Sequence, residues 1–376
     1  MSVVGTAMNT SNPPTLILCV DARFLTPHFP GIGRVLSALL SEWAHHPHVA
    51  ALHIITNQRQ PASCYATPVA TATTHYHSID AHPFGILEAI AIRRIVMQVH
   101  PDWYYSPHFW LPWLPLPTRL LATIHDAIPL HADHVPPIKR WLITALMRWC
   151  IWRADCITTV SGAAAHQLTQ AFSIPQLSVI PNGAPVPLPP LPVPTGIATP
   201  YVLCVSSNQP HKNLSTLCAA WQQLWQQQLL PASYQLIIAG HIDPRYPHPK
   251  HWFAGSDAPY TVVANPTEAQ LHALYQHADC FVTPSLAEGH GLPVYEALSY
   301  GLAVLHHHEF PNQTQLATST YHCDMRTPAH LAHALSALLN TQTPPMPQLI
   351  PHLPSWAHVA QAYLDVMQKS TPTQQN

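Results

Sequence analysis

One stretch in the second half of the chain restricts the fold more than any other: Thr283-Pro-Ser-Leu-Ala-Glu-Gly-His-Gly-Leu-Pro-Val-Tyr-Glu-Ala-Leu-Ser-Tyr-Gly301. An apolar strand, Cys280 to Thr283, leads into it, and a polar, glycine-containing loop follows. Pro293 fits the first turn of a helix, where a backbone N–H would have no partner, and Gly301 fits the helix end. The stretch therefore predicts a strand, a loop and a helix over residues 294–300.

The start of this helix is a candidate anion site. Backbone N–H groups at Gly289, His290, Gly291 and Leu292 and the positive end of the helix dipole face the loop. The acids Glu288 and Glu296 flank it. They would repel a phosphate but can accept hydrogen bonds from ribose or sugar hydroxyls. Alternatively they stabilise the helix start, by about 0.3–1 kcal/mol, and the residues alone leave both interpretations open.

The run Glu-Gly-x-Gly-Leu-Pro-x-x-Glu-Ala resembles the Glu-x7-Glu signature of retaining, nucleotide-sugar-dependent glycosyltransferases of the GT-B fold, the glycosyl transferases group 1 family. The resemblance covers about residues 15–367. It includes four further motifs: Asp21-Ala-Arg23, Gly31-Ile-Gly-Arg34, Thr123-Ile-His-Asp126 and Pro210-His-Lys-Asn-Leu214. It implies an α/β fold in which two Rossmann-like parallel-sheet domains face a central cleft. The alternation of strand and helix patterns along the chain independently favours two parallel α/β units.

Length and composition agree with a two-domain protein. The chain has 376 residues, of which 47% are hydrophobic and only 9% charged, and its net charge is -2. This charge gives no electrostatic basis for binding nucleic acid. The eight cysteines form no Cys-x-x-Cys pair, and we find neither a signal peptide nor an apolar run that could span a bilayer. We expect a cytoplasmic protein, and the sequence does not indicate its oligomeric state.

A proline-rich run marks the domain boundary. Residues 184–200 contain seven prolines and no charged residue, which predicts a semi-rigid linker. We expect a disordered lead over 1–14, an N-terminal acceptor-side domain over 15–183 and a C-terminal donor-side domain over 201–350. The last segment, 351–376, is predicted to form a helix that crosses back to the first domain, followed by a tail.

In the first domain, two places are candidates for the site. Gly31 and Gly33 are predicted to lie in a loop between a strand and the helix over 35–43, which is either a tight turn or a phosphate-type loop. His125 follows the strand over 119–124, at the edge of the sheet where ligands bind. It is either a core histidine held by Asp126 or, as the resemblance implies, a residue beside the transferred sugar.

In the second domain, Lys212 stands before a predicted helix over 214–227, with Asn213 as its predicted cap. A lysine at a helix N-terminus opposes the helix dipole, which a bound phosphate would resolve. The alternative is a solvated surface lysine. The resemblance implies that Lys212 binds the donor diphosphate. A second basic residue, which many family members carry in this loop, is replaced near Ser207, and this puts donor affinity in doubt.

Three further segments have a less direct interpretation. The run His306-His307-His308 is predicted to be a loop rather than a metal-ligand set. The aromatic, proline-rich segment 109–117 either packs locally or presents rings to a sugar or a membrane. The helix over 139–153 carries three tryptophans and four basic residues, which permits peripheral contact with a membrane, on its inner face.

The resemblance implies a role for each candidate residue. Glu288 would hold the sugar hydroxyls, Glu296 the ribose, and His125 would orient the sugar near the reacting carbon. Neither a metal nor a cofactor is expected, and the sequence has no Asp-x-Asp triplet. The acceptor would be a glycan or a lipid-linked molecule. The motif variants are most similar to bacterial mannosyltransferases of surface polysaccharide synthesis, which favours GDP-mannose as donor.

Two other hypotheses remain open. The chain could be a catalytically silent GT-B scaffold in polysaccharide assembly, which the loss of the basic residue at Ser207 would suggest. It could also be a nucleotide-sugar epimerase on the same fold. Turnover with any acceptor would exclude the scaffold, whereas free nucleotide diphosphate and free sugar as the only products would indicate the epimerase.

Overall fold

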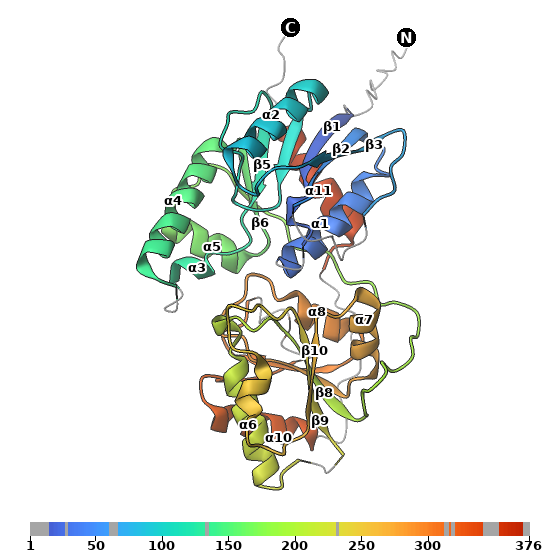
Figure 1. Ribbon diagram of the computed structural model, residues 1–376, viewed down its shortest axis with the longest axis vertical. Helices are drawn as coiled ribbons and strands as arrows, with labels where there is room; N and C mark the ends of the chain where they lie inside the picture. Colours follow the sequence, from blue (N-terminus) through green and yellow to red (C-terminus); the bar gives the residue numbers. More distant parts are fainter. Residues whose placement is uncertain are drawn as a thin grey trace, which may run out of the picture.

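The computed structural model describes residues 15–26, 29–59, 67–131, 135–230, 233–311, 316, 320–340 and 353–370. These residues form two units along the long axis of the molecule, each built on a parallel sheet (Figure 1). The predicted lead, 1–14, and the end of the predicted tail, 371–376, lie outside the described residues.

The first unit contains a seven-stranded sheet in the order β3-β2-β1-β4-β5-β6-β7, and all its strand pairs are parallel. The strands are β1 (Leu16–Asp21), β2 (Val49–Asn57), β3 (Thr74–Ile79), β4 (Trp103–Ser106), β5 (Arg119–Thr123), β6 (Cys156–Thr159) and β7 (Leu177–Val179). The strand order reverses between β1 and β4, and ligands of such sheets bind beyond the strand ends near that point.

Helices cover both faces of this sheet. One face packs against α1 (Pro30–Trp43) and α11 (Trp356–Lys369). The other packs against α2 (Ile86–Val99), α4 (Pro137–Arg153) and α5 (Gly162–Ala171). The strands are apolar on both sides, as expected for a parallel sheet that is covered twice.

The second unit contains a six-stranded parallel sheet in the order β10-β9-β8-β11-β12-β13. Its strands are β8 (Tyr201–Val205), β9 (Gln235–Gly240), β10 (Tyr260–Ala264), β11 (Cys280–Thr283), β12 (Ala303–His307) and β13 (Thr320–Cys323). One face packs against α6 (Leu214–Gln226) and α10 (Pro328–Leu339), the other against α7 (Glu268–His277) and α8 (Leu292–Ser299).

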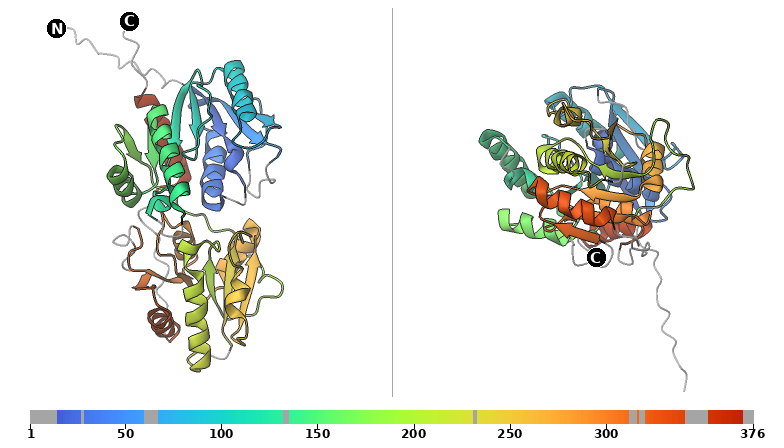
Figure 2. Two further views of the ribbon diagram at one scale, coloured as in Figure 1. Left: turned by 60° about the vertical axis from the view of Figure 1, so that its left-hand side comes forward. Right: turned by 90° about the horizontal axis from the view of Figure 1, so that it is seen from below.

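The last helix, α11, lies in the first unit although it follows the second unit in the chain; it is the red helix in the upper half of Figure 1 and of the left view of Figure 2. Its Tyr363 is buried, donates to or accepts from Thr123 Oγ1 at 3.1 Å, and packs against Tyr105. Trp43 of α1 donates to Ala360 O at 3.2 Å. These buried contacts hold α11 against the first sheet.

The proline-rich segment 184–200 runs between the two units and is attached to the second one. Gln276 of α7 donates from Nε2 to Leu188 O and Pro189 O, both at 2.9 Å, and its Oε1 accepts from Leu191 N at 2.8 Å. Three hydrogen bonds from one side chain therefore fix the middle of the segment.

Several local predictions differ from the structure. Gly31 and Gly33 lie in the first turns of α1 rather than in a loop, because Pro30 takes an early helix position that tolerates proline. The strands β3 and β13 were not predicted, since Thr74–Ile79 and Thr320–Cys323 are short and largely polar. The prediction of a histidine loop at 306–308 is wrong for His306 and His307, which belong to β12.

Candidate functional site

A cavity of about 410 Å³ lies between the two units, at the ends of their strands. Both units line it, and most of the residues predicted for the site are among its walls. From the first unit come Phe29, Gly31, Arg34, His125, Asp126 and Val160, and from the second Ser207, Lys212, Glu288, Gly289, His290, Gly291 and Leu292. Two predicted residues are not among the lining residues: Gly33 is buried within α1, and Glu296 is buried within α8.

The loop before α8 is shaped by two close approaches. Gly291 has φ +79°, and a Cβ at this position would lie 2.0 Å from Phe310 Cζ. A Cβ on Gly289 would lie 2.8 Å from His125 O, in the other unit. Both positions therefore require glycine. The backbone of the loop also accepts a hydrogen bond from the first unit, because Ser161 Oγ donates to Gly289 O at 2.8 Å.

Helix α8 begins at this loop, with Pro293 in its first turn, and Gly301 follows it with φ +78°. Its N-terminal N–H groups are at the cavity wall, which Gly291, Leu292 and Pro293 line. An eight-residue helix whose first turn lines a cavity offers donors and a positive dipole end to an anion.

Lys212 and Glu288 form an ion pair in the cavity wall, with Nζ 2.7 Å from Oε1. Burial would raise the pKa of Glu288, but the Lys212 ammonium and hydrogen bonds from Lys212 and Ser285 outweigh it and lower the pKa. A hydrogen bond from Leu286 N to His211 O, at 3.0 Å, joins the two loops that carry this pair. The carboxylate is therefore ionised at neutral pH and held beside a cation.

Asn213 is the N-cap residue of α6, as predicted, but its side chain forms no capping hydrogen bond with the helix backbone. It adopts a left-handed conformation (φ 55°), and its Nδ2 donates to Pro284 O at 3.2 Å and to Met325 O at 2.8 Å. Its Oδ1 accepts from Thr216 Oγ1 at 2.6 Å. This buried amide ties the turn that carries Lys212 to the loop that leads to Glu288.

Glu296 is not itself a lining residue, but it is paired with one from the first unit, Arg34. Its Oε1 accepts from Arg34 Nη1 of α1, and its Oε2 accepts from Tyr275 Oη at 2.8 Å. Arg34 also forms an ion pair with Glu268, at 3.2 Å. Arg34 was not predicted as a site residue, although it completes the Gly31-Ile-Gly-Arg34 motif. It brings a second cation into the cavity, where the sequence had suggested that Lys212 stands alone.

Two histidines line the cavity in neutral form. Burial lowers the pKa of His125 to about 4 and the pKa of His290 to about 4. His125 Nε2 lies 3.0 Å from Pro107 O, and His290 Nδ1 lies 3.1 Å from Val160 O. A carbonyl oxygen only accepts, so these nitrogens carry the protons and each ring keeps one acceptor nitrogen. His290 Nε2 is buried and has no hydrogen-bond partner among the described residues.

Asp126 lies beside this pair of histidines and approaches Gly289, where an added Cβ would come within 3.3 Å of its Oδ2. Its Oδ1 accepts from Ile128 N at 3.0 Å, so it shapes the turn after His125 rather than holding the ring. Burial raises the pKa of this carboxyl. Among the described residues, no hydrogen bond joins the Asp126 carboxylate to the His125 ring, so the structure does not support the interpretation of His125 as a histidine held by Asp126.

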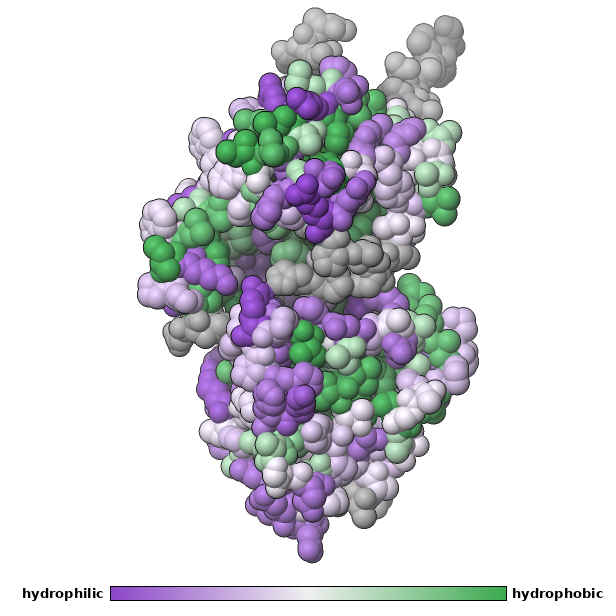
Figure 3. Space-filling view, in the orientation of Figure 1, coloured by the Kyte–Doolittle hydropathy of each residue, from purple (hydrophilic) through white to green (hydrophobic). Residues whose placement is uncertain are grey.

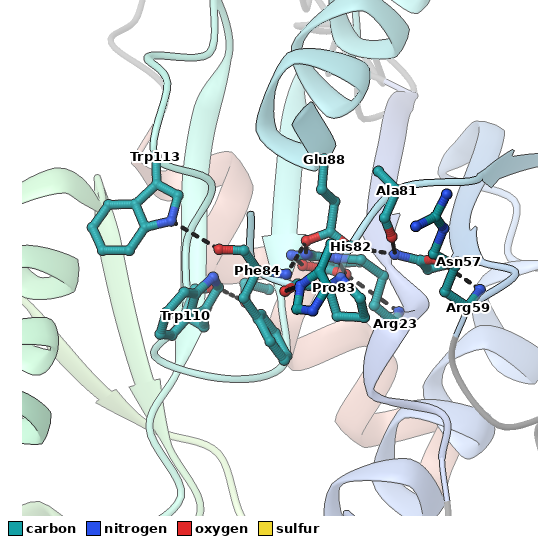
Figure 4. A network of polar contacts seen from close by, with 12 residues as sticks. Arg23, Asn57, Arg59, Ala81, His82, Pro83, Phe84, Glu88, Trp110 and Trp113 are labelled. Atoms are coloured by element: carbon teal, nitrogen blue, oxygen red, sulfur yellow. Dashed lines mark hydrogen bonds and ion pairs between the residues drawn. The ribbon is translucent and has the colours of Figure 1, made fainter. Parts of the chain in front are cut away.

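The Asp21-Ala-Arg23 motif serves a buried network next to the site (Figure 4). The Arg23 guanidinium pairs with Asp21 and Glu88, and all three side chains are buried. Glu88 also accepts from Phe84 N and from Asn57 Nδ2, both at 2.6 Å. Its two acids and one guanidinium give the network a formal net charge of -1, and the hydrogen bond from Phe84 N to Glu88 fixes the loop before α2.

The aromatic segment 109–117 packs against that loop. Trp113 Nε1 donates to Phe84 O at 3.1 Å, and the Trp110 ring lies 4.9 Å from the Phe84 ring and 5.3 Å from the Trp113 ring, between centroids. None of the residues 109–117 lines the cavity. The segment therefore packs locally and lies away from the cavity, while its Trp113 stays 43% exposed.

The histidine run meets other charged groups at the end of β12. His307, His308 and Asp324 place candidate ligand atoms within 4.8 Å of one another. However, Met325 N donates to His307 Nδ1, so the proton of the neutral ring is on Nε2, where a metal would need a lone pair. Arg326 already pairs with Asp324 and Glu309. The contacts describe an ion-pair cluster better than a metal site.

The two halves of the chain match two glycosyltransferase families. Residues 30–186 match "Glycosyltransferase Family 4" and residues 196–349 match "Glycosyl transferases group 1". The matched regions together include His125, Lys212, Glu288 and Glu296, and each contains most of one sheet.

Relatives of similar sequence come from Escherichia coli. The chain is 24% identical over 266 residues to "Serotype-specific mannosyltransferase WbdA", which covers 63% of this chain and 32% of that protein. It is 26% identical over 230 residues to "O-antigen chain mannosyltransferase B", covering 54% of this chain and 56% of the relative. The match thus spans about a third of the first relative and about half of the second.

Solved structures share the arrangement of the two units. Sucrose-phosphate synthase from Thermosynechococcus elongatus superposes with a TM-score of 0.72 at 16% identity, covering 94% of this chain and 98% of that chain. HepE of Anabaena, solved in complex with UDP and glucose, superposes with a TM-score of 0.67 at 14% identity, covering 94% and 100%. At such identities the likeness concerns the fold, which is GT-B. The chain therefore has the GT-B fold. Its first half is similar to glycosyltransferase family 4 and its second half to the group 1 glycosyltransferases.

Proposed function

We propose that this protein is a retaining glycosyltransferase that moves a sugar from a nucleotide-diphosphate sugar to a hydroxyl of a glycan or lipid-linked acceptor. The observation that carries the proposal is the Lys212–Glu288 pair, at 2.7 Å, in a cavity that the first turn of α8 also lines. A cation and a helix N-terminus suit a diphosphate, and a neighbouring carboxylate suits sugar hydroxyls.

The residues of the cavity divide into two chemical groups. Lys212 and the N–H groups from Gly289 to Leu292 would hold the diphosphate, whose negative charge grows as the glycosidic bond breaks. Glu288 and Glu296 would accept hydrogen bonds from sugar and ribose hydroxyls. Because Glu296 is bound to Arg34 in the structure, a ribose must compete with that guanidinium or share the carboxylate with it.

The two neutral histidines fit the same chemistry. His125 and His290 each keep one ring nitrogen as an acceptor, so they can orient hydroxyl groups without adding positive charge at neutral pH. We place the transferred sugar near His125, between the diphosphate site and the first unit.

The reaction that we propose exchanges one bond at the anomeric carbon. The bond from this carbon to the phosphate oxygen breaks, and its electron pair leaves with the diphosphate. The acceptor oxygen bonds to the same face of the sugar, and the acceptor proton goes to the departing phosphate oxygen. No metal is assigned a step, because Lys212, Arg34 and the α8 N-terminus supply positive charge at the cavity wall.

For the donor we favour GDP-mannose, and for the pathway the synthesis of a surface polysaccharide. The two Escherichia coli relatives are named as mannosyltransferases, one of them for an O-antigen chain. The names of these relatives support mannose as the transferred sugar, whereas at such low identity they give less support for guanine as the base of the nucleotide.

The test is transfer from GDP-mannose to a mannoside acceptor, with the anomeric configuration of the product read by NMR. We expect a product with the donor's configuration, and a rate at least about 100-fold lower for Glu288→Ala, from the loss of a charged hydrogen-bond acceptor. Asp80→Ala is the matched control, since this exposed carboxylate lies outside the cavity. Transfer by Glu288→Ala at the wild-type rate would refute the role of Glu288, and an inverted product would refute retention.

A further inference from the structure

Helix α4 turns large apolar side chains toward solvent. Ile138, Trp141, Leu142 and Trp152 are 75%, 68%, 51% and 78% exposed. Their spacing of three, four and ten to eleven residues places them on one side of the helix, opposite the buried Met147 and Cys150. Figure 3 shows hydrophobic residues over α4 at the left edge of the molecule. A soluble surface helix normally has the reverse arrangement.

The same helix is strongly basic in a chain that is not. Lys139, Arg140, Arg148 and Arg153 lie on α4, which has no acidic residue, whereas the whole chain has 15 Lys and Arg residues and a net charge of -2. Lys139 and Arg148 are exposed beside the tryptophans. Apolar and cationic groups thus share one surface, which fits a partner that offers both hydrocarbon and negative charge.

Neighbouring residues extend this surface toward α2. Trp113 is 43% exposed, packs at 5.4 Å between centroids against Trp149 of α4, and reaches Phe84 just before α2 (Figure 4). Ile86 and Leu87, the first residues of α2, are 68% and 72% exposed. We call these seven exposed residues the α4 surface: Ile86, Leu87, Trp113, Ile138, Trp141, Leu142 and Trp152.

The α4 surface begins close to the candidate site along the chain. His125 and Asp126 line the cavity, the short helix α3 (Ile128–His131) follows, and α4 starts at Pro137. In Figure 1, α3 and the adjoining end of α4 lie at the side of the gap between the units.

We propose that the α4 surface docks this protein on the surface of an anionic lipid bilayer. Tryptophan suits the boundary between hydrocarbon and headgroups, where its ring is buried and its N–H is hydrated. The exposed cations meet phosphate headgroups, and each contributes about a fivefold gain in binding near an anionic leaflet. None of the described helices is long and apolar enough to cross a membrane, so the contact is with its surface.

A hollow at the end of α4 adds a place for a headgroup. It has a volume of about 710 Å³ and is lined by Arg148, Trp152, Asp155, Phe172 and Gln176, among others; the Asp155 carboxylate accepts from Leu120 N at 2.8 Å. Arg148 and Trp152 thus belong both to the basic, aromatic helix and to a concave site beside it, where a phosphate could meet the guanidinium.

The experiment is co-sedimentation of the full chain with vesicles of phosphatidylglycerol and phosphatidylcholine, compared with phosphatidylcholine alone. We expect binding to the anionic vesicles that is at least tenfold tighter than to the neutral ones and that weakens as salt is raised. The double variant Trp141→Ala/Trp152→Ala and the double variant Lys139→Glu/Arg148→Glu should each lose at least tenfold in binding. All four side chains are exposed, so the fold is expected to persist, which circular dichroism checks.

Two control variants carry matched changes on the second unit, Leu229→Ser, which is 48% exposed, and Lys250→Glu, which is also exposed. They should bind like the wild type. The proposal is overturned if the wild type fails to sediment with anionic vesicles at low salt, or if the α4 variants bind like the controls. A dimer that forms without lipid and is lost in Trp141→Ala/Trp152→Ala would instead assign this surface to a second copy of the chain. Sedimentation with vesicles requires no turnover, so its outcome does not depend on the proposed function. Transfer to a water-soluble acceptor is expected to be unchanged in the α4 variants.

Discussion

Acidification is expected to destabilise this protein strongly, because three histidines of its first unit and cavity are held neutral. Burial lowers the pKa of His108 to about 3, of His125 to about 4 and of His290 to about 4. In the unfolded chain a histidine has a pKa of about 6.5. Between these values the unfolded state binds more protons, so the free energy of unfolding falls as the pH falls.

The size of the effect follows from these values. From pH 7 to pH 5, each such histidine costs about 1.8 kcal/mol of stability, and the three together about 5 kcal/mol. His108 and His125 are only half-buried, so this is an upper figure. Since whole domains are stable by about 5–15 kcal/mol, the protein should be close to unfolding near pH 5.

Urea denaturation at pH 7 and pH 5, followed by tryptophan fluorescence, measures the difference. His290→Asn should reduce the loss by about 1.8 kcal/mol, because its amide can still donate to Val160 O, in place of Nδ1, and does not titrate. His333→Asn, at an exposed position on α10, is the control and should leave the loss unchanged. Equal stability at both pH values, or an unchanged loss in His290→Asn, would refute the reasoning.

Variants at three residues test the cavity wall and the turn next to it. Lys212→Ala should weaken donor binding about 10- to 150-fold by calorimetry, since it removes a charge-assisted contact worth about 1.5–3 kcal/mol. Unchanged affinity would exclude Lys212 from the diphosphate site. Asn213→Ala should lower the free energy of unfolding by about 1–3 kcal/mol and raise the donor KM. Asn213→Gly accepts φ 55°, so it should recover about 1 kcal/mol of this stability but should not restore the KM. Equal stability of the two variants would refute the cost of the left-handed backbone. Gly291→Ala should cost about 2 kcal/mol or more in urea denaturation, because its Cβ would meet Phe310, and a neutral result would contradict the close approach.

The regular part of the fold follows from local pattern. Apolar runs such as Tyr201–Val205 and Cys280–Thr283 are too short for helices and are bounded by polar loops, so the strands could be predicted. Ser161 caps α5 by accepting from Ala164 N, and Thr267 caps α7 in a capping box, as expected from their residue types. By contrast, β3 and β13 depend on pairing with a neighbouring strand, which a short polar sequence does not reveal.

The pairing of the site residues could not be predicted, because it depends on long-range geometry. Lys212 and Glu288 were given to different groups of a donor, yet they bind each other in the structure. Arg34 reaches Glu296 only because α1 starts at Pro30 and directs it across the cavity. The Asn213 side chain donates to the carbonyl oxygens of Pro284 and Met325, which are distant in the sequence, so a local capping rule does not predict its hydrogen bonds. The roles of His125, Glu288 and the other candidate residues toward a donor stay predictions.

The most direct test of the central claim, that the cavity binds a nucleotide-diphosphate sugar, is thermal stability of the full chain in the presence of GDP, UDP, ADP and their sugars. A ligand at a hundred times its dissociation constant should add about 2.7 kcal/mol. We predict that only GDP and its sugar raise the melting temperature, and that Lys212→Ala abolishes the rise. No rise with any of these ligands, or an equal rise in Lys212→Ala, would contradict it and favour a silent scaffold.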